Sequence, residues 1–193
     1  KDGIYKRYNQ LVKKEVINVE KQKMLFLILD ASQKWDKKYI NSIDDEMLQR
    51  FAKILFGFIR PSEKDETVLL KFYNRINRQF NLVSCQFAIH YMFETDETLN
   101  NFVNNINMVL KEDGYFFGTC LDGDLVNDML KNKKKNEEIK GEKNDKLLWL
   151  IQKDYDEYSK RPQDNIGKKI QVYIETINKL TPEYLVDYEL LKY

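Results

Sequence analysis

The stretch that decides the fold runs from Asn81 to Cys120, NLVSCQFAIHYMFETDETLNNFVNNINMVLKEDGYFFGTC. It begins with a short strand-like run, Asn81–Gln86, and ends with an apolar run, Tyr115–Cys120. Between them, apolar residues recur at helical spacing: Leu99, Phe102, Val103, Ile106, Val109 and Leu110. Short runs without alternation are typical of parallel strands covered on both faces. The stretch therefore predicts a buried strand, a helix that ends at the turn Glu112–Gly114, and a second buried strand.

The same alternation extends toward the N-terminus. Lys23–Leu29 is another largely apolar run, so we expect a third buried strand there. Strands that alternate with helices of this length indicate an α/β fold. We therefore expect a doubly wound, Rossmann-like sheet in which Asp30, Gln86 and Cys120 end neighbouring parallel strands at one rim. The helical stripes outside the opening stretch are Ile4–Val12, Met47–Phe58 and Leu69–Ile76.

The second half of the chain has a different pattern. Residues 131–146 are almost all charged or amide residues that cannot bury enough apolar surface to fold alone, so we expect a flexible, solvated connection there. Leu147–Ile151 and Lys169–Ile174 are expected to be strands, the latter half exposed because its apolar residues alternate. Thr181–Glu183 has the chemistry of a helix start, with a threonine cap, a proline and a carboxylate. The whole length fits one domain.

Composition argues against several classes of protein. The longest apolar run, Met24–Leu29, is far shorter than the roughly 20 residues that span a bilayer, so no membrane partner is expected. Two cysteines, Cys85 and Cys120, make neither a disulfide framework nor a metal site. The sequence contains no glycine-rich phosphate loop, which argues against a nucleotide triphosphatase or a complete dinucleotide-binding fold. The net charge of +1 is uninformative about a nucleic-acid partner, which would require basic residues clustered on one face.

Polar side chains follow each of the three expected strands, at the rim where open α/β sheets bind their ligands. They lie in Asp30–Ser32, Gln86–Tyr91 and Leu121–Asp124. Each group also has a purely structural interpretation: Asp30 suits a helix cap, and His90, the single histidine, suits an ordinary core or surface position. The residue types alone therefore name no reaction.

Four motifs in order carry a more specific resemblance. They are Phe26-Leu-Ile-Leu-Asp-Ala-Ser32, Asn81-Leu-Val-Ser-Cys-Gln-Phe-Ala-Ile-His-Tyr-Met-Phe-Glu94, Leu110-Lys-Glu-Asp-Gly-Tyr-Phe-Phe-Gly-Thr119, and Tyr173-Ile-Glu175 with Pro182-Glu-Tyr-Leu-Val186. With these motifs the chain resembles the mRNA cap guanine-N7 methyltransferases, which are class I S-adenosylmethionine-dependent enzymes. The resemblance implies methyl transfer from S-adenosyl-L-methionine to N7 of the guanine at the capped 5′ end of mRNA.

The resemblance also implies four cofactor-binding residues. Asp30 is expected to accept a hydrogen bond from the adenine amino group, with Ser32 beside it. Gln86 and Phe87 are expected to line the adenine and methionine parts of the cofactor. No metal is expected at this site.

Three further residues are implied for the cap. His90 and Tyr91 are expected to face the guanine and the transferring methyl group, and Glu183 to accept hydrogen bonds from guanine N1 and the exocyclic amine. A carboxylate is complementary to paired N–H donors and rejects adenine, which lacks that pattern. Since N7 is already nucleophilic and the sulfonium already activates the methyl group, we expect positioning and electrostatics to provide the catalysis and assign no general base.

The chain departs from the family pattern in three places. The acidic residue and glycine-rich turn expected near the start are absent, the chain stops before the family's final strands, and Cys120-Leu-Asp-Gly123 stands where many members have Thr-Pro-Asn-Ser. We therefore expect a single methyltransferase domain over 1–193 that is incomplete at both ends and binds its cofactor poorly.

Two alternatives remain open. One is a catalytically silent, methyltransferase-like subunit that binds RNA or stimulates a partner, and the other is a methyltransferase that acts on a small molecule. For the cap enzyme we expect other mRNA-capping activities as partners. We expect a nuclear location in a cellular eukaryote and a cytoplasmic one for a virus.

Overall fold

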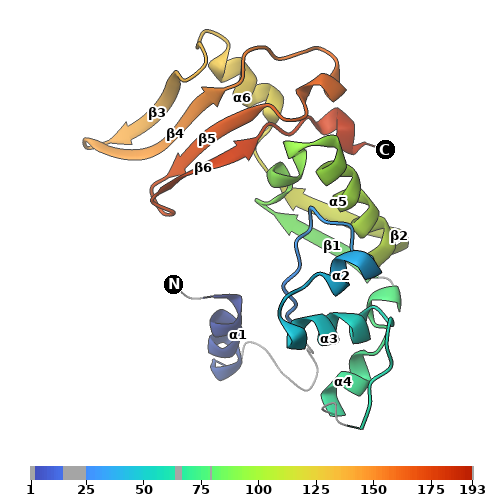
Figure 1. Ribbon diagram of the computed structural model, residues 1–193. Coiled ribbons are helices and arrows are strands. Elements are labelled where there is room, and N and C mark those ends of the chain that lie inside the picture. The colour runs from blue at the N-terminus through green and yellow to red at the C-terminus, as the bar shows by residue number, and fades with distance from the viewer. Residues whose placement is uncertain (1–2, 15–24, 64–66, 79, 193) are drawn as a thin grey trace.

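The structure is a computed structural model that describes residues 3–14, 25–63, 67–78 and 80–192 (Figure 1). Helices dominate the part of the chain before the first strand, and a two-stranded and a four-stranded sheet follow. None of the described helices is long and apolar enough to cross a bilayer. The N-terminal helices are α1 (Ile4–Lys13), α2 (Lys37–Asn41), α3 (Glu46–Leu55) and α4 (Thr67–Phe72), and a 3-10 helix, η1 (Ile76–Arg78), comes after them.

The strand, helix and strand expected from Asn81 to Cys120 are confirmed. Strand β1 (Phe80–Gln86) pairs in parallel with β2 (Leu110–Thr119), and helix α5 (Asp96–Val109) connects them. The register runs from Leu82 opposite Tyr115 to Gln86 opposite Thr119. The expected turn at 112–114 is an irregularity at the start of β2, where Asp113 has a φ of 61°.

The two strands are not buried on both faces, which corrects the sequence prediction. In β1 exposed and partly buried residues alternate after Leu82, so one face packs while Leu82 on the other face is 56% exposed. Tyr115 in β2 is 74% exposed. The physical reason is that α5 covers one face of this sheet, as Cys85 and Phe116 pack against its apolar cluster.

The strand expected at Lys23–Leu29 is also corrected. Residues 23 and 24 lie outside the described ranges, and 25–29 form no strand, since no described segment pairs with them. Leu27 and Leu29 instead pack against the cluster of Ile40, Ala52, Leu55 and Phe56 under α2 and α3, while Ile28 is 82% exposed. Asp30 therefore does not end a strand.

The helices predicted in this region are confirmed with adjusted limits. α1 and α3 overlap the expected stripes, and α3 buries Ala52, Ile54 and Leu55. Asp45 caps α3 by accepting a hydrogen bond from the Leu48 amide. The stripe at 69–76 is divided between α4 and η1.

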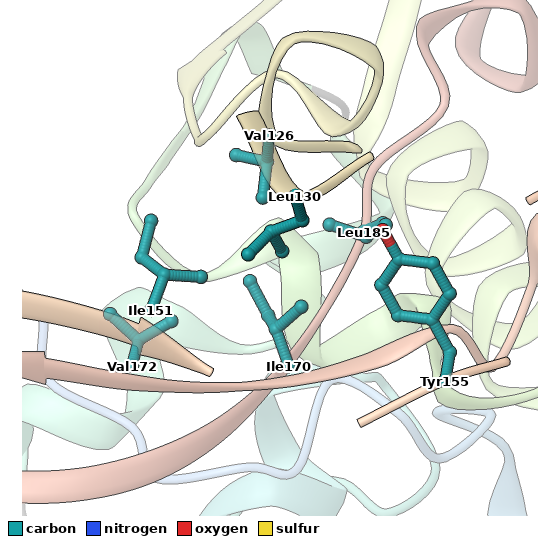
Figure 2. Packing of buried hydrophobic residues seen from close by; sticks show 7 residues of the cluster. All are labelled: Val126, Leu130, Ile151, Tyr155, Ile170, Val172 and Leu185. Atoms are coloured by element: carbon teal, nitrogen blue, oxygen red, sulfur yellow. The ribbon is translucent and has the colours of Figure 1, made fainter. Parts of the chain in front are cut away.

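The second sheet contains four antiparallel strands in the order β3-β4-β5-β6, with helix α6 (Gly123–Leu130) on one face (Figure 1). It confirms the strands at 147–151 and 169–174, but its antiparallel pairing departs from a doubly wound sheet. Figure 2 shows Val126 and Leu130 of α6 packing on Ile151, Ile170 and Val172 of the strands. The strands are β3 (Glu138–Lys143), β4 (Lys146–Asp154), β5 (Lys169–Ile174) and β6 (Lys179–Tyr184).

The connection expected at 131–146 contains strand β3, which corrects the prediction. Ile139 packs on the core of the sheet, and Lys140 forms an ion pair with Glu142 at 2.9 Å. Asn144 and Asp145 both have positive φ, of 52° and 60°, as a tight hairpin turn to β4 requires. The charged residues of 138–143 therefore belong to a paired strand.

The helix start expected at Thr181–Glu183 is wrong, because these residues lie in β6. Glu183 is opposite Ile170 of β5, and Pro182 is opposite Gln171. β6 is an edge strand, where a proline is tolerated because its missing N–H would have faced outward. Pairing with β5 therefore determines the structure of these residues, although their local sequence is typical of a helix start.

The start of α5 provides a first test of local stability. The Thr95 hydroxyl accepts a hydrogen bond from the Thr98 amide, and the Thr98 hydroxyl accepts one from the Thr95 amide. Thr95→Ala should lower the free energy of unfolding by about 1 kcal/mol, the usual cost of losing a helix cap. Urea unfolding measures this change, with the exposed Asn100→Ala as the control on the same helix. Equal stabilities of Thr95→Ala and the wild type would contradict the cap.

Candidate functional site

His90 and Glu183 form the centre of the candidate site. His90 lies in the 3-10 helix η2 (Ile89–Glu94) and is 5% exposed, while Glu183 of β6 is 9% exposed. Their Nε2 and Oε2 atoms are 3.7 Å apart. The two elements are joined beside this pair, because the Tyr184 hydroxyl donates to the Glu94 carboxylate at 2.7 Å. The expected cap residues are thus brought together although they are far apart in sequence.

Burial controls the protonation of both groups. It lowers the pKa of His90 from 6.5 to about 4 and raises the pKa of Glu183 above its usual range. Although the separation would allow an ion pair, the imidazole is therefore neutral near pH 7. Neither ring nitrogen of His90 has a hydrogen-bond partner among the described residues. Buried polar groups are rarely left unpaired, so a ligand is the natural partner for this ring.

Tyr91 extends the site toward the surface. Its ring lies edge-on to His90 with centroids 4.2 Å apart, and its side chain is 44% exposed. Burial, and then the charge of Glu183, raise the pKa of Tyr91. His90, Tyr91 and Glu183 therefore place a neutral imidazole, a phenol and a carboxylate around one small region.

The His90 ring should contribute a measurable pH dependence. Its folded pKa is depressed, so between pH 6.5 and about 4 the unfolded chain binds a proton that the folded chain does not, and stability falls as the pH falls. Glu183 acts in the opposite direction, because its raised pKa stabilises the fold at low pH and loses that effect as the pH rises through it. His90→Asn should therefore reduce the acid loss of stability, by at most about 1.4 kcal/mol per pH unit.

Urea unfolding of the wild type and His90→Asn across this pH window measures the difference in slope. Parallel curves for the two proteins would contradict the buried, neutral histidine.

Gln86 and Phe87 lie where the sequence predicts, at the carboxyl ends of the parallel strands. The Gln86 amide accepts a hydrogen bond from the Thr119 hydroxyl at 2.8 Å and donates one to Ser84 at 3.0 Å. Phe87 donates its N–H to the Thr119 carbonyl at 2.8 Å, has a φ of 49° and is 67% exposed. The two strand ends therefore present an anchored amide and an open aromatic ring.

Asp30 and Ser32 form a turn of their own. The Asp30 Oδ1 atom accepts hydrogen bonds from the Ser32 amide at 2.8 Å and the Ser32 hydroxyl at 2.7 Å. The interpretation of Asp30 as a helix cap is wrong, because the helix that follows, α2, is capped by Asp36. Both bonds end on Oδ1, so Oδ2 of this carboxylate is not used by the turn.

One hydrophobic cluster connects all these groups. It contains Ile89 and Phe93 of η2 and Leu99 and Phe102 of α5. Immediate sequence neighbours of the predicted site residues pack against this cluster or belong to it: Ala31 beside Asp30 and Ser32, Cys85 beside Gln86, Ile89 beside His90, Met92 beside Tyr91, and Tyr184 beside Glu183. The segments that carry most of the predicted cofactor and cap residues therefore pack on one core.

Other candidate sites are less suited to polar chemistry. A cavity of about 620 Å³ between residues 25–29 and the helical region of 35–80 is walled mainly by apolar side chains, and none of the predicted site residues lines it. In the part of the chain that the structure describes, no three His, Cys, Asp or Glu side chains gather closely enough to hold a metal ion.

The sequence prediction missed two asparagines of α5. Asn105 is 3% exposed and binds the loop that carries Asp30 and Ser32, and Asn101 binds the Ser32 carbonyl at 3.0 Å. A signal was present, because Asn105 lies three residues after Phe102 and four before Val109, on the apolar face of the helix. A polar residue there requires a buried partner.

Comparison with known proteins identifies the family. The model of the mRNA (guanine-N(7))-methyltransferase domain matches residues 28–193. A probable mRNA-capping enzyme of Acanthamoeba polyphaga mimivirus is 33% identical over 124 residues, covering 61% of this chain and 10% of that protein. mRNA cap guanine-N(7) methyltransferases of Aspergillus clavatus and Saccharomyces cerevisiae are 29% and 30% identical over 58% of this chain. The chain spans about a quarter of those two proteins. It belongs to the mRNA (guanine-N(7))-methyltransferase family.

Proposed function

We propose that the protein transfers a methyl group from S-adenosylmethionine to N7 of the guanine that caps mRNA. The buried His90 ring with two unpartnered nitrogens, 3.7 Å from Glu183, is the observation that carries the proposal. Its relatives are named for capping or for cap guanine-N(7) methylation, which supports the same reaction.

The polar groups of the pair are complementary to guanine. A neutral imidazole offers one N–H donor, and the Glu183 carboxylate offers only acceptors. The edge of guanine opposite N7 presents a carbonyl acceptor beside two N–H donors. His90 then donates to O6, and Glu183 accepts from N1 and the exocyclic amine. Adenine has an amino donor in place of O6, an acceptor at N1 and no amine at C2, so binding it would leave buried groups mismatched.

The chain also has groups suited to the methyl donor. Oδ2 of Asp30 suits the adenine amino group, the exposed Phe87 ring suits a flat or apolar surface, and the Gln86 amide is anchored beside it. S-adenosylmethionine supplies, when bound, a methyl group already activated by a sulfonium.

The residues of the site act by positioning and electrostatics. Guanine N7 carries its own lone pair, so no side chain has to remove a proton. Glu183 and His90 hold the base in one orientation, and the partly exposed Tyr91 lies beside the His90 ring. The charge of the Glu183 carboxylate favours the positive charge that the base acquires on methylation. No residue is assigned as a general base.

The two alternatives are less well supported. A silent subunit needs no base pocket, yet His90 and Glu183 are kept buried without satisfying each other. A small-molecule enzyme would not require groups complementary to guanine.

We also propose that the protein binds RNA and works with other capping activities, since one relative is named as a capping enzyme. The nucleus in a cellular eukaryote, or the cytoplasm for a virus, is the corresponding location.

Calorimetric titration of the full protein with guanosine-capped and adenosine-capped dinucleotides tests the pocket. We expect the guanosine cap to bind about 10-fold more tightly or better, since a mismatched buried polar group costs about 1–3 kcal/mol. Equal affinities would overturn the proposal.

A further inference from the structure

We propose that Asn105 is a positioning residue for the methyl donor, acting through the loop that carries Asp30 and Ser32. The proposal rests on the proposed function, in which Asp30 accepts a hydrogen bond from adenine. It assigns to Asn105 no contact with the cofactor or with the cap.

Asn105 is bound to three backbone groups of one short loop. Its Oδ1 accepts a hydrogen bond from the Trp35 amide at 2.9 Å. Its Nδ2 donates to the Gln33 carbonyl at 2.7 Å and to the Ala31 carbonyl at 3.2 Å. The amide thus uses its acceptor and both donors on a segment about 70 positions away in sequence.

Asn105 is connected to Asp30 through Trp35. The Trp35 indole N–H donates to the Asp30 carbonyl at 2.9 Å, and the Asp30 amide donates to the Tyr39 hydroxyl at 2.7 Å. The backbone of Asp30 is therefore held on both sides, and one of the two holding residues is itself held by Asn105. Without Asn105, the carboxylate would have to be ordered when the ligand binds, which lowers affinity.

Asn101 supports the same loop more weakly. It lies one helical turn before Asn105 on the same face of α5 and donates to the Ser32 carbonyl at 3.0 Å. It makes one of the four bonds that attach the loop to the helix. Asn104 lies between the two but is exposed, so it provides a matched asparagine without this role.

The test measures the dissociation constant of S-adenosylmethionine for the full protein by calorimetry. We expect Asn105→Ala to weaken binding about 10-fold, Asn101→Ala by less, and Asn104→Ala not at all. The affinity for a guanosine-capped dinucleotide should not change in any of them. A purely structural role would lower the melting temperature and both affinities together.

A double-mutant cycle with Asp30→Ala tests whether Asn105 acts through Asp30. If Asn105 acts through Asp30, Asn105→Ala should weaken binding far less in the Asp30→Ala background than in the wild type. Additive effects, or a folded Asn105→Ala with unchanged affinity, would overturn the inference. If Asn105→Ala does not fold, Asn101→Ala takes its place in the cycle. An Asp30→Ala variant that binds normally would instead contradict the proposed cofactor site, and the inference would fall with it.

Discussion

Glu183→Gln is expected to lower methyl transfer to guanosine-capped RNA about 10-fold or more, since leaving a buried polar group mismatched costs about 1–3 kcal/mol. The substitution keeps the shape of the side chain but presents an N–H donor where guanine requires an acceptor. Glu183 lies within β6, paired opposite Ile170, so its replacement should disturb no helix start. A methyl-transfer assay measures the loss.

The specificity of this variant distinguishes recognition from general damage. An inosine cap lacks the exocyclic amine, so the wild type should prefer guanosine to inosine, and Glu183→Gln should lose most of that preference. Glu142→Gln, on an exposed glutamate of the same sheet, is the matched control and should behave as the wild type. Full activity of Glu183→Gln would remove the cap-pocket assignment, and lost cofactor binding would mean that the residue belongs to another site.

Asp30→Ala is expected to weaken S-adenosylmethionine binding by about 1–3 kcal/mol, the range for losing a hydrogen bond to a charged group. Calorimetry on the full protein measures the change. The turn must be controlled for, because Ala also removes both hydrogen bonds from Ser32 to Oδ1. Asp30→Asn can keep that turn while presenting an amide to adenine.

The pair of variants separates two roles for Asp30. Comparable losses in Asp30→Ala and Asp30→Asn would identify the carboxylate as the adenine acceptor. Normal binding by Asp30→Asn would mean that Asp30 only shapes the turn, and unchanged binding by both would exclude it from the cofactor site.

Elements that depend on local patterns could be predicted from the sequence. α5 and the strands around it were predictable, because the helical stripe at Leu99–Leu110 and the flanking runs each indicate one structure. The extent of burial was not, since it depends on what covers a sheet. Leu82 is apolar but 56% exposed, because only the other face of β1 packs on α5.

Elements whose structure depends on pairing with a neighbouring strand were mispredicted. Thr181–Glu183 has a valid helix-start pattern, but pairing with β5 makes it an edge strand that tolerates Pro182. Residues 138–143 looked too charged to fold, yet β4 supplies their hydrogen bonds and Ile139 anchors them to the core. The Asn144-Asp145 pair is typical of a tight turn and could have indicated this hairpin.

The candidate site shows the same division. Gln86 could be placed at a strand end from pattern alone, whereas the meeting of His90 with Glu183 followed only from resemblance, because no local pattern relates residues so far apart. The loop that Asn105 binds could not be predicted, although a polar residue on the apolar face of α5 indicates a buried partner. Side-chain hydrogen bonds of this kind depend on tertiary packing rather than on periodicity.

The most direct measurement of the central claim is the position of the transferred methyl group. The full protein is incubated with methyl-labelled S-adenosylmethionine and guanosine-capped RNA, and the RNA is digested to nucleosides and separated. The account predicts that the label appears as N7-methylguanosine from the cap and nowhere else in the RNA. Label on another atom, or no transfer by a protein that binds both the methyl donor and the capped RNA, would contradict it.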